Sequence, residues 1–160
     1  MTNGWPANWT AQFAGRDCEM CAAGRPERDA YGIRIAAETY SDAYLQRADV
    51  QRGYTLVIWR GRHVAEPTEL EDSEAQGYWL EVLRVARALQ HHYRPLKLNY
   101  QVLGNTAPHL HTHLLPRYAE DPAPGRPFPL PVLTGHERKL PEDQLEHDVT
   151  ALRLLLNSQQ

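Results

Sequence analysis

The segment His109-Leu110-His111-Thr112-His113-Leu114-Leu115 is the most informative stretch of the chain. In a β-strand, alternate side chains point to the same face and each residue adds about 3.3 Å. The three histidines are therefore expected to form a row on one face of a strand, with about 7 Å between neighbouring imidazoles. Imidazole can be a nucleophile, a proton carrier or a metal ligand near neutral pH, so this row marks a candidate functional site.

Three kinds of site are compatible with the row. Core or surface histidines with a purely structural role account for one His more easily than for three. An oxygenase-type metal site in a β-barrel usually needs a further carboxylate or His on a neighbouring strand, where the sequence offers Asn99 and Gln101. In covalent catalysis, one imidazole attacks an electrophile while its neighbours hold its tautomer and protonate the leaving group.

The residues just before the row favour covalent catalysis. Gly104 lets the backbone approach a ligand closely, and the backbone N–H groups of such a loop can cradle a phosphate. Asn105 and Thr106 add neutral donors that can stabilise charge on phosphorus, and Asn99 lies one strand earlier. Each of these residues also has an ordinary alternative role, such as stabilising a turn.

The pattern of apolar residues around this segment predicts five strands. Residues 54–60 (YTLVIWR) are apolar and β-branched, as expected of a central strand. Ser41 and Asp42 are predicted to form a turn. The predicted strands are residues 31–38, 43–47, 54–60, 97–103 and 109–118.

Two helices are predicted. The first opens at a capping box of Ser73 and Gln76 and runs to about residue 92, before Pro95. Its predicted apolar stripe is Trp79, Leu80, Leu83, Ala86 and Leu89. The second helix covers about residues 141–156. Its predicted apolar stripe is Leu145, Val149, Leu152 and Leu156.

The remaining segments complete the predicted architecture. Residues 116–131 contain six prolines, so this stretch is expected to be extended and not helical. No repeat or linker divides the chain, so residues 1–160 are predicted to form one domain. Strands with segregated helices predict an α+β fold with a mainly antiparallel sheet, one long helix and a C-terminal helix.

Composition narrows the classes of function. The 160 residues carry a net charge of −3, which gives no electrostatic reason to expect nucleic-acid binding. No stretch approaches the length of a membrane span, and residues 1–15 lack the basic lead-in and apolar run of a signal peptide. We therefore expect a cytoplasmic protein with no membrane or nucleic-acid partner.

The chain has two cysteines, Cys18 and Cys21, within residues 5–29, which are predicted to be an irregular loop or knuckle. A structural disulfide is not expected in a reducing compartment. The Cys-x-x-Cys spacing fits half of a zinc site, a redox pair or two unrelated thiols, and the spacing alone does not choose between them.

The motifs together resemble the histidine triad (HIT) family, whose signature is His-φ-His-φ-His-φ-φ with φ apolar. Asn99 and residues 104–106 precede the signature as they do in the family. Residues 53–58 (GYTLVI), followed by His63, resemble the family's Gly-His-x-Leu-Val-Ile strand and its trailing His. The two cysteines resemble the N-terminal zinc knuckle of zinc-bearing members. The similarity spans about residues 18–118.

This resemblance implies a nucleotide hydrolase that cleaves at the α-phosphorus of a dinucleoside polyphosphate, such as a diadenosine polyphosphate, or of a nucleoside phosphoramidate. By position, His111 matches the nucleophile that forms a covalent nucleotidyl-histidine intermediate, which water then hydrolyses. His113 would assist with phosphate and leaving-group contacts, and Thr106 would hold phosphate oxygens. The further contacts implied for a purine nucleotide are Asn99, Asn105, Gln46 and Tyr44.

The resemblance also implies a cofactor and a partner. In zinc-bearing relatives the ligands match Cys18, Cys21, His63 and His109. A Cys₂His₂ set fills a tetrahedral zinc and leaves no open position, so the expected metal is one structural zinc per chain. The family further implies a homodimer whose two sheets join edge to edge.

Three residues depart from the family pattern. Thr112 is polar where the signature has an apolar residue, but it belongs to the face opposite the histidines. Tyr54 stands where many members have His, which would remove a possible partner of the nucleophile. Gln46 stands near a position where relatives often have an acidic ribose contact, which leaves the nucleoside preference open.

Two alternatives to hydrolysis stay open within the same family. A nucleotidyltransferase or phosphorylase would use phosphate or a sugar phosphate in place of water, but the related uridylyltransferase branch lacks a third His, so His113 favours the hydrolase. A non-catalytic nucleotide-binding protein would keep the pocket without turnover, and the intact His111 argues against it.

Overall fold

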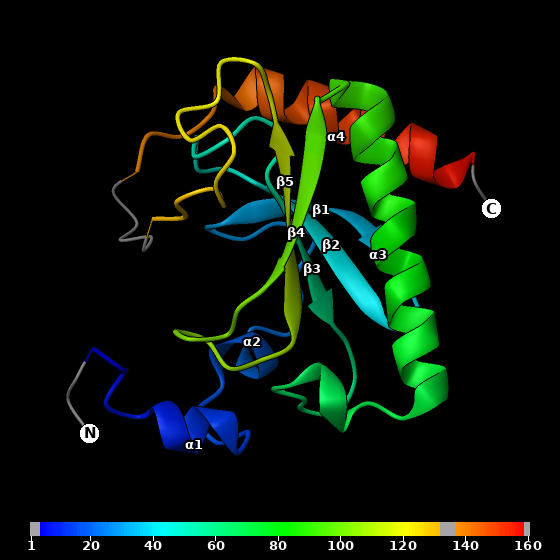
Figure 1. The fold of residues 1–160 in the computed structure, drawn as a ribbon. Coiled ribbons are helices and arrows are strands. Elements are labelled where there is room, and N and C mark those ends of the chain that lie inside the picture. The colour runs from blue at the N-terminus through cyan, green and yellow to red at the C-terminus, as the bar shows by residue number, and fades with distance from the viewer. Residues whose placement is uncertain (1–3, 132–136, 159–160) are drawn as a thin grey trace.

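A five-stranded sheet forms the centre of the molecule (Figure 1). The computed structural model describes residues 4–131 and 137–158. The strand order is β1-β2-β3-β5-β4, and every neighbouring pair is antiparallel. The strands are β1 (Gly32–Ala37), β2 (Ser41–Gln46), β3 (Thr55–Trp59), β4 (Lys97–Val102) and β5 (His111–Arg117). The predicted α+β fold with a mainly antiparallel sheet is confirmed.

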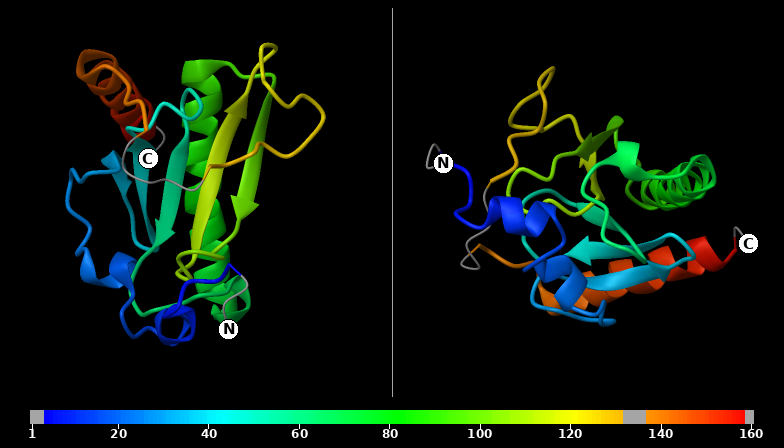
Figure 2. Two further views of the ribbon diagram at one scale, coloured as in Figure 1. Left: turned by 90° about the vertical axis from the view of Figure 1, so that its left-hand side faces the viewer. Right: turned by 90° about the horizontal axis from the view of Figure 1, so that it is seen from below.

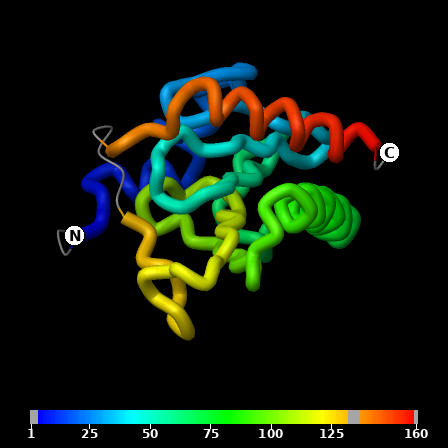
Figure 3. Tube along the Cα trace, turned by 90° about the horizontal axis from the view of Figure 1, so that it is seen from above, coloured from blue at the N-terminus to red at the C-terminus, as the bar shows by residue number. Residues whose placement is uncertain are grey.

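Two long helices cover one face of this sheet. α3 (Asp72–Tyr93) packs against β5 and β2, and α4 (Glu142–Asn157) packs against β1. Figure 3 shows α3 nearly end-on while α4 runs across the view, so the helices cross at a steep angle. The left view of Figure 2 shows α3 behind the strands, with the N-terminal segment on the near side. Within the described ranges, no helix is long and apolar enough to cross a membrane.

The face that α3 presents to the sheet differs from the predicted stripe. Ala86 and Leu89 are buried as expected and Trp79 is partly buried, but Leu80 and Leu83 are exposed. The buried face is completed by Tyr78, Val82, Val85, Ala88 and Tyr93. The buried residues repeat at the helical spacing of three and four, so the predicted stripe was displaced toward Leu80 and Leu83 on the side of the true apolar face.

The first turn of α3 is capped two residues earlier than predicted. The backbone N–H of Glu71 donates to the carboxylate of Glu74 at 2.9 Å, and Ser73 lies inside the first turn. The proposed pair of Ser73 and Gln76 is therefore wrong. Both pairs have the three-residue spacing of a capping box, so spacing alone does not distinguish them. The negative charges of Glu71 and Glu74 are also stabilised by the positive end of the helix dipole.

The predicted C-terminal helix is present as α4. Its four predicted core residues are all buried, and the helix begins directly after Pro141. Asp148, which is also buried, accepts hydrogen bonds from His92 and from the Tyr93 hydroxyl, each at 2.9 Å. These bonds join the end of α3 to the middle of α4.

The turn predicted at Ser41 and Asp42 is instead the start of β2. Both residues are fully buried. The Ser41 hydroxyl donates to Glu81 at 2.7 Å, and the Asp42 carboxylate accepts from Arg25 at 2.9 Å. Ser and Asp are common in turns, which misled the local interpretation. Partners far away in sequence thus bind these groups inside the sheet, although Oδ1 of Asp42 accepts no hydrogen bond among the described residues and has only the Arg34 guanidinium nearby, at 3.8 Å.

Residues 5–29 contain two short helices in addition to irregular backbone. They are α1 (Trp9–Phe13) and α2 (Glu19–Ala22). In α1, the Trp9 ring lies 5.0 Å from both the Trp5 and Phe13 rings, measured between centroids. Helices of one turn are too short to leave a periodic apolar pattern, so the prediction of a purely irregular segment was wrong here.

The proline-rich segment after β5, residues 118–131, is called the strap below. It contains turns and irregular backbone with no helix, so the predicted extended backbone is interrupted at residues 119–120 and 124–125. Arg117 organises the strap. Its guanidinium donates to the Ala123 carbonyl at 2.7 Å, pairs with Asp121 and lies 5.5 Å from the centre of the Phe128 ring.

Candidate active site and metal centre

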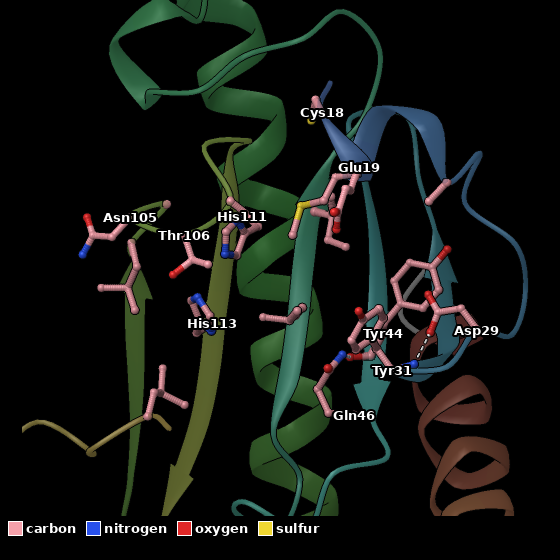
Figure 4. Close-up of a pocket in the computed structure, with 18 of the residues that line it drawn as sticks. Cys18, Glu19, Asp29, Tyr31, Tyr44, Gln46, Asn105, Thr106, His111 and His113 are labelled. Carbon is pink, nitrogen blue, oxygen red and sulfur yellow. Dashed lines mark hydrogen bonds between the residues drawn. The ribbon is translucent and has the colours of Figure 1, made fainter. Parts of the chain in front are cut away.

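The open face of the sheet forms the floor of a cavity of about 710 Å³. Seven predicted site residues line it, namely Cys18, Tyr44, Gln46, Asn105, Thr106, His111 and His113. Figure 4 shows the two histidines in the middle, with Asn105 and Thr106 on one side and Tyr44 and Gln46 on the other. A ligand that spans the cavity would therefore pass over both imidazoles.

The pairing register explains why these side chains share one cavity. His113 lies opposite Leu56 on β3, and Leu56 lies opposite Tyr44 on β2. His111 lies opposite Ile58 in the same way. Paired residues project from the same face of a sheet, so three strands present one continuous row to the ligand side.

Asn99 lies outside the set of residues that line this cavity. It is on β4 opposite Leu115, and its side-chain oxygen accepts a hydrogen bond from Arg117. Asn99 was predicted to contact phosphate, and in the structure its side chain binds Arg117, the residue just before the strap.

His111 is held by a hydrogen bond to the backbone of its own strand segment. Its Nδ1 lies 2.6 Å from the backbone oxygen of His109, and a carbonyl can only accept, so Nδ1 carries the proton. The ring is 6% exposed, and burial lowers the pKa of His111. The neutral ring therefore has its lone pair at Nε2, which is the form a nucleophile or base requires.

His113 sits beside His111 with a different partner. The Tyr54 hydroxyl lies 2.8 Å from Nδ1 of His113, and the two rings are almost parallel. Burial lowers the pKa of His113 to about 3, so this imidazole is neutral near pH 7. Tyr54 thus has His113 as its partner, and its hydroxyl does not pair with His111 among the described residues.

The three histidines do not form one evenly spaced row. His109 precedes β5 and turns toward the cysteines, whereas His111 and His113 lie within the strand. The ring centroids of His111 and His113 are 4.8 Å apart, closer than the predicted spacing, because the side chains lean toward each other. The segment therefore serves two sites.

Thr112 belongs to the face that packs on α3. It is fully buried, and its hydroxyl lies 2.8 Å from the Tyr78 hydroxyl. Tyr78 also donates to the Val57 carbonyl at 3.0 Å. The polar residue at this signature position is therefore paired, and it does not reach the cavity.

The loop between β4 and β5 brings polar groups to the cavity. Gly104 has a φ of 87°, in the left-handed region that glycine adopts without strain. Asn105 and Thr106 follow it, are exposed and line the cavity. Their side chains are available to a ligand above the histidines.

The other predicted cluster is also assembled. The Nδ1 of His109 lies 3.6 Å from the Cys18 sulfur and 3.4 Å from the Cys21 sulfur, and the Nδ1 of His63 lies 3.4 Å from the same Cys21 sulfur. All four donor atoms lie within 4.8 Å of one another. The four residues can hold a metal ion.

The surroundings of this cluster fit a metal. Nε2 of His109 donates to the Trp59 carbonyl at 3.0 Å, and Nε2 of His63 donates to the Phe13 carbonyl at 3.1 Å. Both rings thus turn the Nδ1 lone pair toward the sulfurs, which is the outer-shell arrangement typical of metal-binding histidines. Burial lowers the pKa of His109 to about 4, whereas burial and the neighbouring thiol raise the pKa of Cys21 to about 11.

Several cavity residues had no signal in the sequence. Glu19, Arg25 and Asp29 also line the cavity, although nothing in their local pattern marks them. Arg25 is held by Asp42, and Arg34 and Arg60 lie 3.8 Å and 3.6 Å from that same carboxylate. Only the folded sheet brings this group together.

The fold and the site define the class of the protein. It is an α+β protein with a histidine-bearing strand on the floor of a cavity and a Cys₂His₂ cluster beside it. The HIT domain family model matches residues 28–120, and the chain belongs to this family. "Protein hit" of Bacillus subtilis is 32% identical over 94 residues, which are 53% of this chain and 64% of that protein.

Solved structures share the fold. A histidine triad protein from Bradyrhizobium japonicum superposes with a TM-score of 0.70 at 25% identity, over 78% of this chain and 90% of its own. A histidine triad protein from Marinobacter aquaeolei gives 0.66 at 25% identity, over 81% and 91%. A Zn-bound histidine triad family protein from Mycobacterium smegmatis gives 0.59 at 22% identity, over 88% and 91%.

Proposed function

We propose that the protein is a nucleotide hydrolase that cleaves at the α-phosphorus of a dinucleoside polyphosphate or a nucleoside phosphoramidate. The observation that carries this proposal is the state of His111. Its Nδ1–H is bound to the His109 carbonyl, which leaves Nε2 as a free lone pair in a cavity with neutral donors. A fixed, uncharged imidazole of this kind suits nucleophilic attack on phosphorus.

The reaction has two balanced steps. Nε2 of His111 attacks the α-phosphorus, and the bond from phosphorus to the leaving oxygen or nitrogen breaks, so that the leaving group departs with the electron pair. Water then attacks phosphorus, the P–N bond breaks, and a nucleoside monophosphate and a proton are released. The imidazole is regenerated in its starting form.

The proposed substrate contacts follow from the layout of the cavity. Asn105 and Thr106 lie on one side of the histidines and would donate to phosphate oxygens. Tyr44 and Gln46 lie on the other side and would contact a purine nucleoside. Gln46 is buried, and its Nε2 donates to the Tyr44 carbonyl at 3.2 Å, so its amide is held in place.

We further propose one structural zinc per chain, bound by Cys18, Cys21, His63 and His109. Two thiolates and two neutral imidazoles match the preference of zinc and complete a tetrahedral shell, so no step of the reaction passes through the metal. The site would tie the N-terminal segment to the strand that carries His111. Both cysteines are free thiols, in keeping with a cytoplasmic location.

A homodimer is the proposed assembly. β4 is an edge strand of the sheet, and exposed apolar side chains occur on it, beside it and on α3. They are Leu80, Leu83, Leu96, Tyr100 and Leu103. Sedimentation of the wild type as a dimer, and of Tyr100→Asp as a monomer, would support pairing of two such edges. A wild-type monomer at high concentration would contradict it.

The central experiment is mass spectrometry of the protein mixed briefly with diadenosine tetraphosphate or an adenosine phosphoramidate and quenched without acid. The wild type should carry an adduct of AMP mass and release AMP over time, whereas His111→Ala should show neither. His91→Ala is the matched control, because His91 is an exposed histidine on α3 outside the cavity. It should behave as the wild type.

Other outcomes separate the alternatives. An adduct that turns over only when phosphate or a sugar phosphate is added would indicate a transferase or phosphorylase. Binding of the nucleotide without adduct or AMP would indicate a non-catalytic nucleotide-binding protein. Full activity in His111→Ala would refute the nucleophile.

A further inference from the structure

The buried Tyr54 and the partly buried His113 form a hydrogen-bonded pair at the floor of the cavity. The Tyr54 hydroxyl oxygen lies 2.8 Å from Nδ1 of His113. The ring planes differ by 8°, and the ring centroids are 5.9 Å apart. Tyr54 is 5% exposed, and both residues line the cavity. The contact joins neighbouring strand segments, because Tyr54 directly precedes β3 and His113 is on β5.

The hydroxyl is the donor in this pair. Among residues 4–131 and 137–158, Nδ1 of His113 is the hydrogen-bond partner of this hydroxyl, and a buried O–H that donates to nothing is unfavourable. Burial raises the pKa of Tyr54 and lowers that of His113, so the phenol keeps its proton and the imidazole stays neutral near pH 7. A neutral imidazole that accepts at Nδ1 carries its proton at Nε2.

We infer that Tyr54 is a positioning residue that fixes His113 as the Nε2–H tautomer, so that His113 offers a hydrogen-bond donor to the cavity. His111 is fixed in the opposite sense, with Nδ1–H on the His109 carbonyl and a free lone pair at Nε2. The two rings are 4.8 Å apart between centroids. A phosphoryl group above them would meet a nucleophile from one ring and a donor from the other.

The strap keeps Tyr54 in place. Tyr54, Leu115 and Phe128 form a small buried cluster on the cavity side of the sheet. Arg117 lies 5.5 Å from the centre of the Phe128 ring and anchors the strap through carbonyls and Asp121. The phenol ring is therefore packed from the strap side while its hydroxyl reaches His113.

The test is the tautomer of His113, read from the ¹⁵N chemical shifts of its two ring nitrogens by NMR without substrate. In the wild type, His113 should give the pattern of a protonated Nε2 and an unprotonated Nδ1. In Tyr54→Phe, which removes only the hydroxyl, a measurable fraction of the Nδ1–H tautomer should appear. His111 should keep its own pattern in both proteins.

Tyr78→Phe is the matched control. It removes the hydroxyl of another buried tyrosine, whose bonds go to Thr112 and Val57 on the α3 side of the sheet. It should leave the His113 signals unchanged. The effect on turnover rests on the proposed function: Tyr54→Phe should lower kcat by about tenfold with little change in KM, since the lost bond acts on the donor to the phosphoryl group.

The outcomes are distinct. A wild-type His113 with its proton on Nδ1 overturns the inference, and this measurement stands even if Tyr54→Phe does not fold. Unchanged His113 signals in a folded Tyr54→Phe also overturn it. The expected tautomers in a protein that hydrolyses no nucleotide would refute the proposed hydrolase and leave the role of Tyr54 intact.

Discussion

His109 and His111 lie two residues apart, yet the structure leaves opposite nitrogens free on the two rings. His109 donates from Nε2 to the Trp59 carbonyl and turns Nδ1 toward two sulfurs. His111 donates from Nδ1 to the His109 carbonyl and leaves Nε2 free in the cavity. The position of one backbone carbonyl thus decides whether an imidazole suits a metal centre or a nucleophilic site.

The two sites also differ in what they connect. The metal-type cluster joins α2, the segment after β3 and the start of the histidine segment. His111 and His113, by contrast, lie within one strand that is already held by neighbours on both sides. Loss of the first site should therefore reduce stability, and loss of the second should reduce activity. The following predictions test this division, from the largest expected effect to the smallest.

His111→Ala should lower turnover by at least about 10⁴-fold, since the proposed nucleophile is removed. Metal content and thermal midpoint should stay close to those of the wild type, because His111 is outside the cluster. Steady-state kinetics, elemental analysis and calorimetry on the same preparation provide the check. Metal loss in this variant would break the proposed separation of the sites.

Cys18→Ser should remove the metal and lower the free energy of unfolding by roughly 3 kcal/mol or more, because binding energy at a structural site adds to folding stability. Cys18 is buried between the N-terminal segment and His109, and serine keeps nearly the same volume. Chemical denaturation with and without a chelator measures the effect. A chelator should have little further effect on the variant, and an equally stable, metal-free wild type would contradict the prediction.

The affinity of the cluster for metal should rise with pH. The pKa of Cys21 is raised to about 11 without metal, mainly by burial, so zinc must displace a proton from this thiol near pH 7. Competition titrations with a chromophoric chelator between pH 6 and 8 should show tighter binding at the higher pH. A pH-independent affinity would mean that the thiol is already ionised.

His113 should make the protein less stable in acid. Its pKa is about 3 in the folded state against an ordinary value of 6.5, so between these values the unfolded chain binds more protons. Stability should therefore decrease as pH falls from about 6.5 toward 3, with a contribution from His113 of up to about 1 kcal/mol per pH unit. His113→Asn should show a shallower decrease in urea unfolding series, and identical slopes would exclude this contribution.

Thr112→Val should have the smallest effect. It removes a hydroxyl that faces α3, while Tyr78 keeps its bond to the Val57 carbonyl. We expect a loss of about 1 kcal/mol or less in unfolding free energy and unchanged turnover. A marked fall in kcat would show that the two faces of β5 are coupled.

Much of the fold could be predicted because its signals are local. The apolar, β-branched run of β3, the alternating histidines of β5 and the apolar stripe of α4 depend on residues close in sequence. The start of β2 could not be predicted, because Asp42 is buried only with the help of Arg25, Arg34 and Arg60. The predicted face of α3 was partly wrong because it included Leu80 and Leu83, which are exposed, although the buried residues of this helix do repeat at helical spacing.

The candidate site shows the same limit. The histidine spacing predicted a shared face for His111 and His113, and family resemblance, not spacing, suggested the four possible metal ligands. The bond between Tyr54 and His113 depends on how the segment before β3 packs against β5, which no local pattern encodes. Asn99 was predicted from the family pattern, but its side-chain oxygen accepts a hydrogen bond from Arg117, which the pattern does not indicate.

The short segment from His109 to Arg117 supplies one residue to the metal-type cluster, two to the cavity and the anchor of the strap. These roles depend on alternation between two faces, and a shift of one residue moves every side chain to the other face. A substitution on the α3 side changes the packing at one position and leaves the alternation intact. The insertion or deletion of one residue in this segment would disconnect its two sites at once, so its length is more tightly constrained than its composition.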